Sequence, residues 1–190
     1  SSDKRAGVSG SINFRGIEGL EIAAVAGIDY VLSEKLGITP PTAYSEITSG
    51  VPERERGKLT KDKNTTMNLS SNVRVTYNRA FGKHDLTLGA NFDFYSDHYD
   101  NLGITGYGLT KKMQSASGVN QSIEGNRKPS FTSKNEKTAQ LGIGVLAGYS
   151  WNNIYDLFGT YKSDASSILP SDKRWNSAWA VGAGWSLKNY

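Results

Sequence analysis

Apolar and polar residues alternate along seven stretches of the chain. In the clearest stretch, residues 67–81, Met67, Leu69 and Val73 alternate with asparagine, serine and arginine side chains. The other six stretches are residues 5–15, 20–31, 86–96, 139–151, 154–162 and 175–185. A period of two predicts β-strands with one apolar face, and no stretch shows a competing helical period. The pattern therefore predicts an all-β chain, an antiparallel up-and-down meander of about seven to eight strands.

The connections between these stretches alternate in length. Short links cover residues 15–19, 79–85 and 151–154, and long polar loops cover about 33–63, 97–136 and 163–174. Short turns at one end and long loops at the other are typical of outer-membrane barrels. We therefore expect residues 1–190 to form a single region, part of a transmembrane β-barrel. A hydrophobic content of 37% does not exclude this, because only every second residue of a barrel strand faces lipid, so the composition is neutral on this point.

The stretch WNSAWAVGAGW, residues 175–185, carries its large side chains on one face. Trp175 and Trp185 lie ten residues apart, which is ~33 Å along a strand and ~25 Å after tilting, the height of the apolar band of a barrel. We expect the large residues to face lipid and Ala180, Gly182 and Gly184 to face the lumen. Val181→Arg should then oppose insertion, whereas Gly182→Ser should be nearly neutral. The predicted lipid-facing girdle consists of Tyr149, Trp151, Trp175, Trp179 and Trp185.

The polar face of residues 86–99 carries the candidate binding residues. Asp93, Tyr95, Asp97 and Tyr99 alternate along one face and lead into a long loop. Aromatic rings flanked by carboxylates suit sugar rings and cationic peptide groups, so these four form the predicted substrate site at the lumen mouth. The alternative is that tyrosine and aspartate line the mouth of a barrel without binding a substrate.

Composition and motif searches narrow the function classes. The net charge of +4 is small and scattered, which argues against nucleic-acid binding. No apolar run reaches the ~18 residues of a membrane helix. His84 and His98 have no nucleophile or paired carboxylates at a recognisable spacing, so we predict no enzyme and no cofactor. Asp97, His98 and Asp100 could touch a metal, but His98 faces away from Asp97, and no metal site is predicted.

The last third of the chain resembles the SusC/RagA-type TonB-dependent outer-membrane transporters. The family shows an aromatic strand, a basic residue, Asp-Gly-Ser-Ser, Arg-Trp-Gly, Phe-Pro-Ser and a closing Gly-Trp. Here Ala165 replaces the first glycine, and residues 176–178 replace the next glycine and the start of Phe-Pro-Ser. INFRGIEGLEIAAVAGIDY and HDLTLGANFDFYSDHYDN also resemble hairpins of this family. The matching positions are Lys162, Asp164, Ser166, Ser167, Arg174, Trp175, Gly184 and Trp185.

The resemblance implies a fragment of a larger protein in the outer membrane of a Gram-negative cell. Such a transporter has a barrel of roughly 22 strands and an internal plug, and imports glycans or peptides. The implied partners are outer-membrane lipid, the rest of the barrel with its plug, the TonB complex and a SusD-like surface lipoprotein. Seven strands are an odd number, so we expect a mid-barrel segment whose first and last strands remain edges.

Two other interpretations stay open at this stage. One is a self-contained small outer-membrane barrel with a structural or adhesive role carried by the long loops. The other is a soluble β-barrel that binds an apolar ligand, in which the tryptophans of residues 175–185 would pack inside an enclosed interior.

Overall fold

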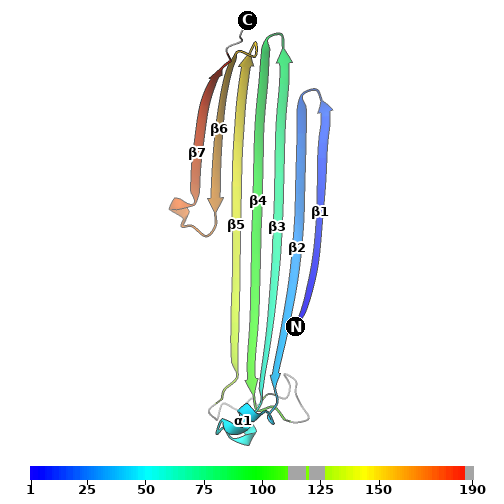
Figure 1. Ribbon diagram of the computed structural model, residues 1–190, viewed down its shortest axis with the longest axis vertical. Helices are drawn as coiled ribbons and strands as arrows, with labels where there is room; N and C mark the ends of the chain where they lie inside the picture. Colours follow the sequence, from blue (N-terminus) through cyan, green and yellow to red (C-terminus); the bar gives the residue numbers. More distant parts are fainter. Residues whose placement is uncertain (111–118, 120–126, 187–190) are drawn as a thin grey trace. The chain divides into compact units, whose positions relative to one another are not determined.

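The computed structural model describes residues 1–110, 119 and 127–186, which form a meander of seven strands (Figure 1). The sheet order follows the chain from β1 to β7, which confirms the predicted all-β meander. The strands are β1 (Ser2–Ile17), β2 (Leu20–Thr39), β3 (Lys58–Phe81), β4 (His84–Tyr107), β5 (Ser130–Trp151), β6 (Tyr155–Ser166) and β7 (Trp175–Trp185). The helical segments are α1 (Tyr44–Thr48), η1 (Glu53–Glu55) and η3 (Ser171–Lys173).

Four strands extend further into the long connections than the alternation predicted. β2 continues to Thr39 and β3 begins at Lys58, so their connection is residues 40–57 rather than 33–63. β4 likewise continues to Tyr107, and β5 begins at Ser130. The reason lies in the residue types, because segments such as KLTKDKNTT (58–66) are polar at nearly every position. A strand with two polar faces has no apolar period by which to recognise it.

The short turns are built from residues that tolerate a positive φ. In the β5–β6 turn, Asn152 and Asn153 have φ values of 53° and 55°, which suits the type I′ geometry of a tight hairpin. The Asn152 N–H donates to the Lys83 carbonyl at 2.6 Å, so the β5–β6 turn is tied to the β3–β4 turn. Adjacent short turns are thereby held together at one end of these strands.

The chain forms two compact units, and strands β1 to β5 contribute residues to both. Unit 1 comprises Ser1–Ala6, Tyr30–Met67 and His98–Glu136, and unit 2 comprises Gly7–Asp29, Asn68–Asp97 and Lys137–Tyr190. Unit 1 contains α1 and η1 together with a small core of Leu59 and Leu109. Unit 2 contains β6, η3 and β7, and most of the predicted site residues.

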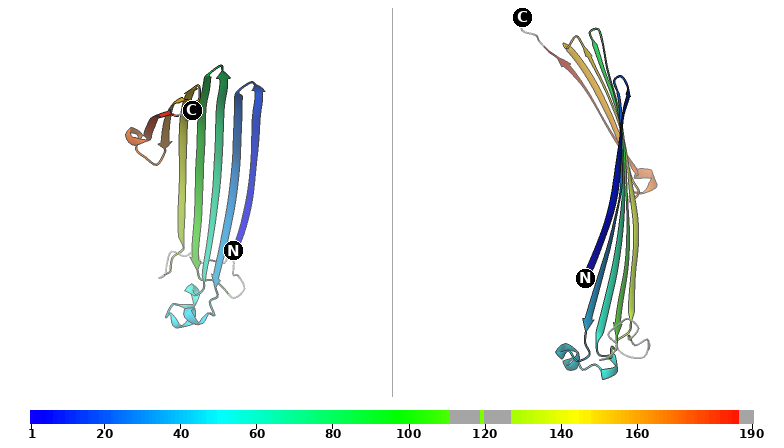
Figure 2. Two further views of the ribbon diagram at one scale, coloured as in Figure 1. Left: turned by 45° about the horizontal axis from the view of Figure 1, so that its top comes forward. Right: turned by 90° about the vertical axis from the view of Figure 1, so that its right-hand side faces the viewer.

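β1 and β7 are the first and last strands of the described sheet (Figure 2). Within the part of the chain that the structure describes, β7 pairs with β6 and the sheet order does not return to β1. This agrees with the expectation that the first and seventh strands are edges. None of the helices found among the described residues has the length and apolar character needed to cross a membrane.

Candidate functional site

The register of β6 and β7 sorts the residues of unit 2 onto two faces. Tyr161 lies opposite Trp179, and Tyr155 lies opposite Trp185, on what we call the apolar face. Asp164 lies opposite Asn176 on the other side, the polar face. The faces differ because successive side chains of a strand point in opposite directions. The large side chains of WNSAWAVGAGW therefore lie on one face of β7 and most of the small ones on the other, as the alternation predicted.

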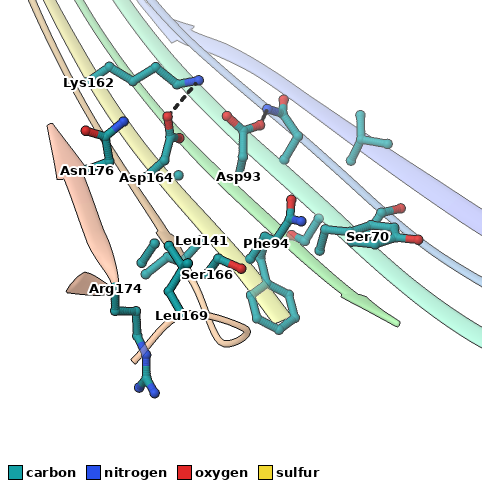
Figure 3. Close-up of a pocket in the computed structure, with 17 residues that line it drawn as sticks. Ser70, Asp93, Phe94, Leu141, Lys162, Asp164, Ser166, Leu169, Arg174 and Asn176 are labelled. Atoms are coloured by element: carbon teal, nitrogen blue, oxygen red, sulfur yellow. Dashed lines mark hydrogen bonds and ion pairs between the residues drawn. The ribbon is translucent and has the colours of Figure 1, made fainter. Parts of the chain in front are cut away.

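A cavity of about 750 Å³ opens on the polar face of unit 2 (Figure 3). It is lined by residues of β2 to β7 and of the β6–β7 connection. Its polar lining includes Ser70, Asn72, Asp93, Gln140, Lys162 and Asp164. The candidate site therefore combines residues that are distant in sequence and adjacent across the strands.

Asp93 is held in place by amide donors on both of its carboxylate oxygens. Asn72 on β3 donates to Oδ1, and Asn91 on β4 donates to Oδ2 at 2.9 Å. Asn91 in turn occupies the space beside Gly144, where an added Cβ would lie 2.1 Å from the Asn91 Oδ1. A carboxylate can accept about four hydrogen bonds, so Asp93 can accept further donors from a ligand. The glycine and the two amides together orient this carboxylate.

A second carboxylate, Asp164, lies across Gly142 from Asp93. A Cβ at Gly142 would lie 2.9 Å from the Asp164 Oδ1 and 3.5 Å from the Asp93 Cβ, so the glycine makes room for both acids. Lys162 forms an ion pair with Asp164 at 3.2 Å, whereas Asp93 is bonded to neutral amides (Figure 3). Arg174 stands at the rim, and its guanidinium points away from both carboxylates (Figure 3). The arrangement can bind polar and cationic groups.

The four predicted binding residues have different environments. Asp93 and Tyr95 line the cavity. Counting outward from the β3–β4 turn, Asp97 lies opposite Asn68, and the Oδ1 atoms of both are buried without a hydrogen-bond partner among the described residues. Tyr99 belongs to unit 1, where its hydroxyl donates to Asn64 at 3.4 Å. The cavity thus includes two of the four residues.

Several residues that line the cavity, and Asn91 beside it, were not predicted as site residues. Asn72 and Asn91 belonged to the polar face of their stretches, but nothing in the alternation shows that they meet at Asp93. Lys162 and Asp164 were matched to a family motif without a binding role. Only the pairing of strands brings these two asparagines, the lysine and the aspartate to one site. The sequence could not predict this, because it does not give the register between strands. Among the described residues, no three histidine, aspartate or glutamate side chains are grouped as a metal site would require.

The apolar face carries a row of stacked rings near the short turns. Trp151 stacks on Tyr155 with ring centroids 5.7 Å apart, and Tyr155 stacks on Trp185 at 6.3 Å. Tyr149 shares a hydrogen bond of 2.6 Å with His84. Tyr155 and His84 were absent from the predicted girdle, because the stacking of Tyr155 on Trp185 and the hydrogen bond between His84 and Tyr149 join residues that are far apart in sequence.

The tryptophans of β7 do not pack in an enclosed interior. Trp175, Trp179 and Trp185 expose 54%, 76% and 65% of their surfaces. A soluble barrel with these side chains in its core would bury them, so this feature counts against the soluble alternative.

Comparison with known proteins identifies the fold. No family model matches the chain, and no curated protein matches it. The solved structure described as the RagAB peptide transporter matches with a TM-score of 0.79 and 20% identity, over 95% of this chain. The chain therefore has the fold of a segment of this transporter structure. The RagAB peptide importer in its "closed-closed" and "open-open" states matches with TM-scores of 0.78 and 0.76, at 21% and 19% identity. Each match likewise covers 95% of this chain, which spans 19% of the length of each matched chain.

Proposed function

We propose that the chain is a wall segment of a TonB-dependent nutrient transporter in the outer membrane of a Gram-negative cell. The observation that carries the proposal is the segregation of side chains in unit 2. One face presents exposed tryptophans and stacked rings, and the other presents amides, carboxylates and a hollow of about 750 Å³. A barrel wall needs this separation, because its outside meets lipid and its inside meets water or protein.

In this proposal the apolar face contacts outer-membrane lipid. Tyr149, Trp151 and Trp185 form the girdle near the short turns, and Trp175 and Trp179 lie toward the other end of β7. Rings with a polar N–H or O–H suit the depth at which headgroups meet hydrocarbon. The remaining barrel, a plug, the TonB complex and a SusD-like surface lipoprotein are the partners, by analogy with the barrel that the fold matches. The role is transport, without catalysis.

Asp93 and Tyr95 are the proposed substrate contacts, with Asp97 and Tyr99 as further candidates along β4. Asp93 has spare acceptor capacity and lies in an open cavity with Lys162 and Asp164 nearby. Peptides are the first substrate class to test, because the matched structures are described as a peptide transporter and importer. Glycans are the alternative class.

Thiol labelling of β7 tests the membrane assignment. The stretch has no native cysteine, so Ala180→Cys and Val181→Cys place one thiol on each face. In isolated outer membranes without other cysteines, a membrane-impermeant maleimide should label residue 180 and leave residue 181 unmodified. Labelling of both residues, or recovery of the protein in the soluble fraction, would refute the proposal.

Uptake of a labelled peptide mixture tests the transport role. Deleting the gene should abolish uptake, and Asp93→Ala should reduce it, while Asp85→Ala on the same face near the β3–β4 turn should leave it unchanged. Uptake of glycans with no uptake of peptides would reassign the substrate class.

A self-contained adhesive barrel is the second candidate. A stop codon directly after Tyr190 and a signal peptide directly before Ser1 would favour it over the transporter.

A further inference from the structure

An apolar groove of about 270 Å³ lies on the apolar face of unit 2. Its cause is Gly159, which stands opposite Val181 at a position where the neighbouring residues of β6 present large side chains. A Cβ at Gly159 would have its nearest neighbours 4.0 Å away, so the position has room for a side chain without a clash. The side chains that line the groove, together with Gly159, are Leu86, Ala147, Tyr149, Leu157 and Val181.

One border of the groove is polar. Tyr149 lines the groove and shares the 2.6 Å hydrogen bond with His84, whose ring stacks on Phe81 at 5.2 Å. Lys83 directly precedes His84 in the β3–β4 turn and is exposed. Its carbonyl accepts the Asn152 N–H, which keeps this turn beside the β5–β6 turn. A hydroxyl–imidazole pair therefore stands at one border of the apolar lining, and an exposed lysine directly precedes this histidine in the chain.

We infer that this groove binds one phospholipid, with an acyl chain along Gly159 and the phosphate beside Lys83 and the His84–Tyr149 pair. The inference rests on the proposed membrane function, since it needs the apolar face to meet lipid. An acyl chain fits a lining made of aliphatic and ring carbons, and burial of its methylene groups is favourable. A cation near the membrane surface attracts anionic headgroups. The occupant thus matches the groove in both polarity and charge.

Titration of the purified full-length protein in a neutral detergent with dioleoylphosphatidylglycerol tests the site. Binding raises the thermal unfolding midpoint, and the concentration dependence gives an apparent affinity. Gly159→Leu fills the groove and should weaken binding by at least about tenfold, which corresponds to two or more methylene groups left unburied. Lys83→Gln should weaken it about fivefold, through loss of one charge near the headgroup.

Two matched variants serve as controls. Ala90→Leu adds the same side chain to the apolar face outside the groove, and Lys173→Gln removes a charge in η3, at the other end of β7. Both should bind the lipid as the unmodified protein does. If Ala90→Leu weakens binding as much as Gly159→Leu, the groove is not the site. If Gly159→Leu fails to fold, the lipid affinity of Lys83→Gln is compared with that of its control, Lys173→Gln, and this comparison decides the outcome.

Two further ligands separate the parts of the site. Inorganic phosphate alone should not stabilise the protein, and oleate should stabilise it less than the phospholipid does. Stabilisation by phosphate alone, or equal stabilisation by oleate, would overturn the inference. If the protein stays in outer membranes but the variants bind the lipid equally well, only the lipid site is refuted. Protein that is soluble without detergent refutes the proposed function itself.

Discussion

Unit 1 and unit 2 differ in how many side chains they bury. Unit 1 buries Leu59 and Leu109, which expose 1% and 3% of their surfaces, together with Glu46 and Glu55. Among the described residues of unit 2, the only buried side chain is that of Ser163. Unit 2 is a single sheet layer with apolar side chains open on one face. A sheet needs a second layer or an apolar solvent to cover such a face.

The small core of unit 1 is built around buried charge. Glu46 Oε2 accepts a hydrogen bond from the Gly57 N–H at 3.0 Å and from Arg127 Nη1 at 2.6 Å. The Arg127 backbone N–H donates to Glu55 at 3.3 Å, and its guanidinium lies over the Tyr107 ring. Unit 1 therefore stabilises its loops through internal contacts, whereas the apolar side chains of unit 2, such as Trp179 and Val181, remain exposed. The comparison shows that the number of side chains buried within the chain does not by itself determine the stability of the fold.

Removing the central cation of unit 1 should have the largest effect. Arg127→Met leaves the Glu46 carboxylate buried without its ion-pair partner, and we expect a loss of about 3–5 kcal/mol of local stability. Hydrogen exchange of amides in residues 40–57 measures it. Arg54→Met is the control, because Arg54 is exposed and its guanidinium comes no closer than 3.8 Å to the Glu55 carboxylate. Equal acceleration in both variants would show that the buried ion pair does not stabilise the loops.

Placing a charge on the apolar face of unit 2 should have the next largest effect. Val181→Arg would put a cation near the middle of the proposed lipid-facing band, at a cost of ~2–4 kcal/mol to folding in a bilayer. Urea unfolding of protein in lipid vesicles measures the free energy, with Val181→Leu as the control. No loss with Val181→Arg would mean that this face does not meet lipid.

A serine on the polar face should also destabilise unit 2 at one position. The ring of Phe158 lies over Gly182, and a Cβ there would be 2.2 Å from the Phe158 Cζ, so Gly182→Ser forces the ring to move. We expect a loss of about 1–2 kcal/mol of folding stability, whereas the prediction from the sequence concerned insertion into the membrane, for which the change should be nearly neutral. Ala180→Ser should stay within about 0.5 kcal/mol. Urea unfolding in lipid vesicles measures these variants as well. Restored stability in the double variant Gly182→Ser/Phe158→Ala would confirm that the clash with the Phe158 ring causes the loss.

The smallest effect concerns the ring row. Tyr155→Leu removes the stacking on both Trp151 and Trp185 and should cost about 1 kcal/mol beyond the change in buried area. Tyr44→Leu in α1 is the control, because Tyr44 is 82% exposed. Thermal unfolding in lipid nanodiscs measures both variants. If the Tyr155 variant is as stable as the unmodified protein, the stacked rings do not stabilise the fold and serve only to position the protein at the membrane surface.

The strands of unit 2 were more predictable than those of unit 1. The boundaries of β7 agree with the alternation in residues 175–185, because one face of β7 is strongly apolar along its whole length. β3 begins at Lys58, but the alternation predicted it only from residue 67, because all of its first nine residues except Leu59 are polar. The buried network of Arg127 and Glu46 had no signal at all, because these residues are 81 positions apart.

The sequence by itself determined the strand content, the order of turns and which side chains share a face, because these follow from local period-two alternation along each strand. It also identified Asp93 and Tyr95 as candidates, since both lie on the polar face of one strand. Only the tertiary structure decided which side chains meet across strands. The amide-held Asp93, its neighbour Asp164 across Gly142, and the groove at Gly159 beside Tyr149 all depend on register. Register is set by pairing between distant segments, and alternation within one strand carries no information about it.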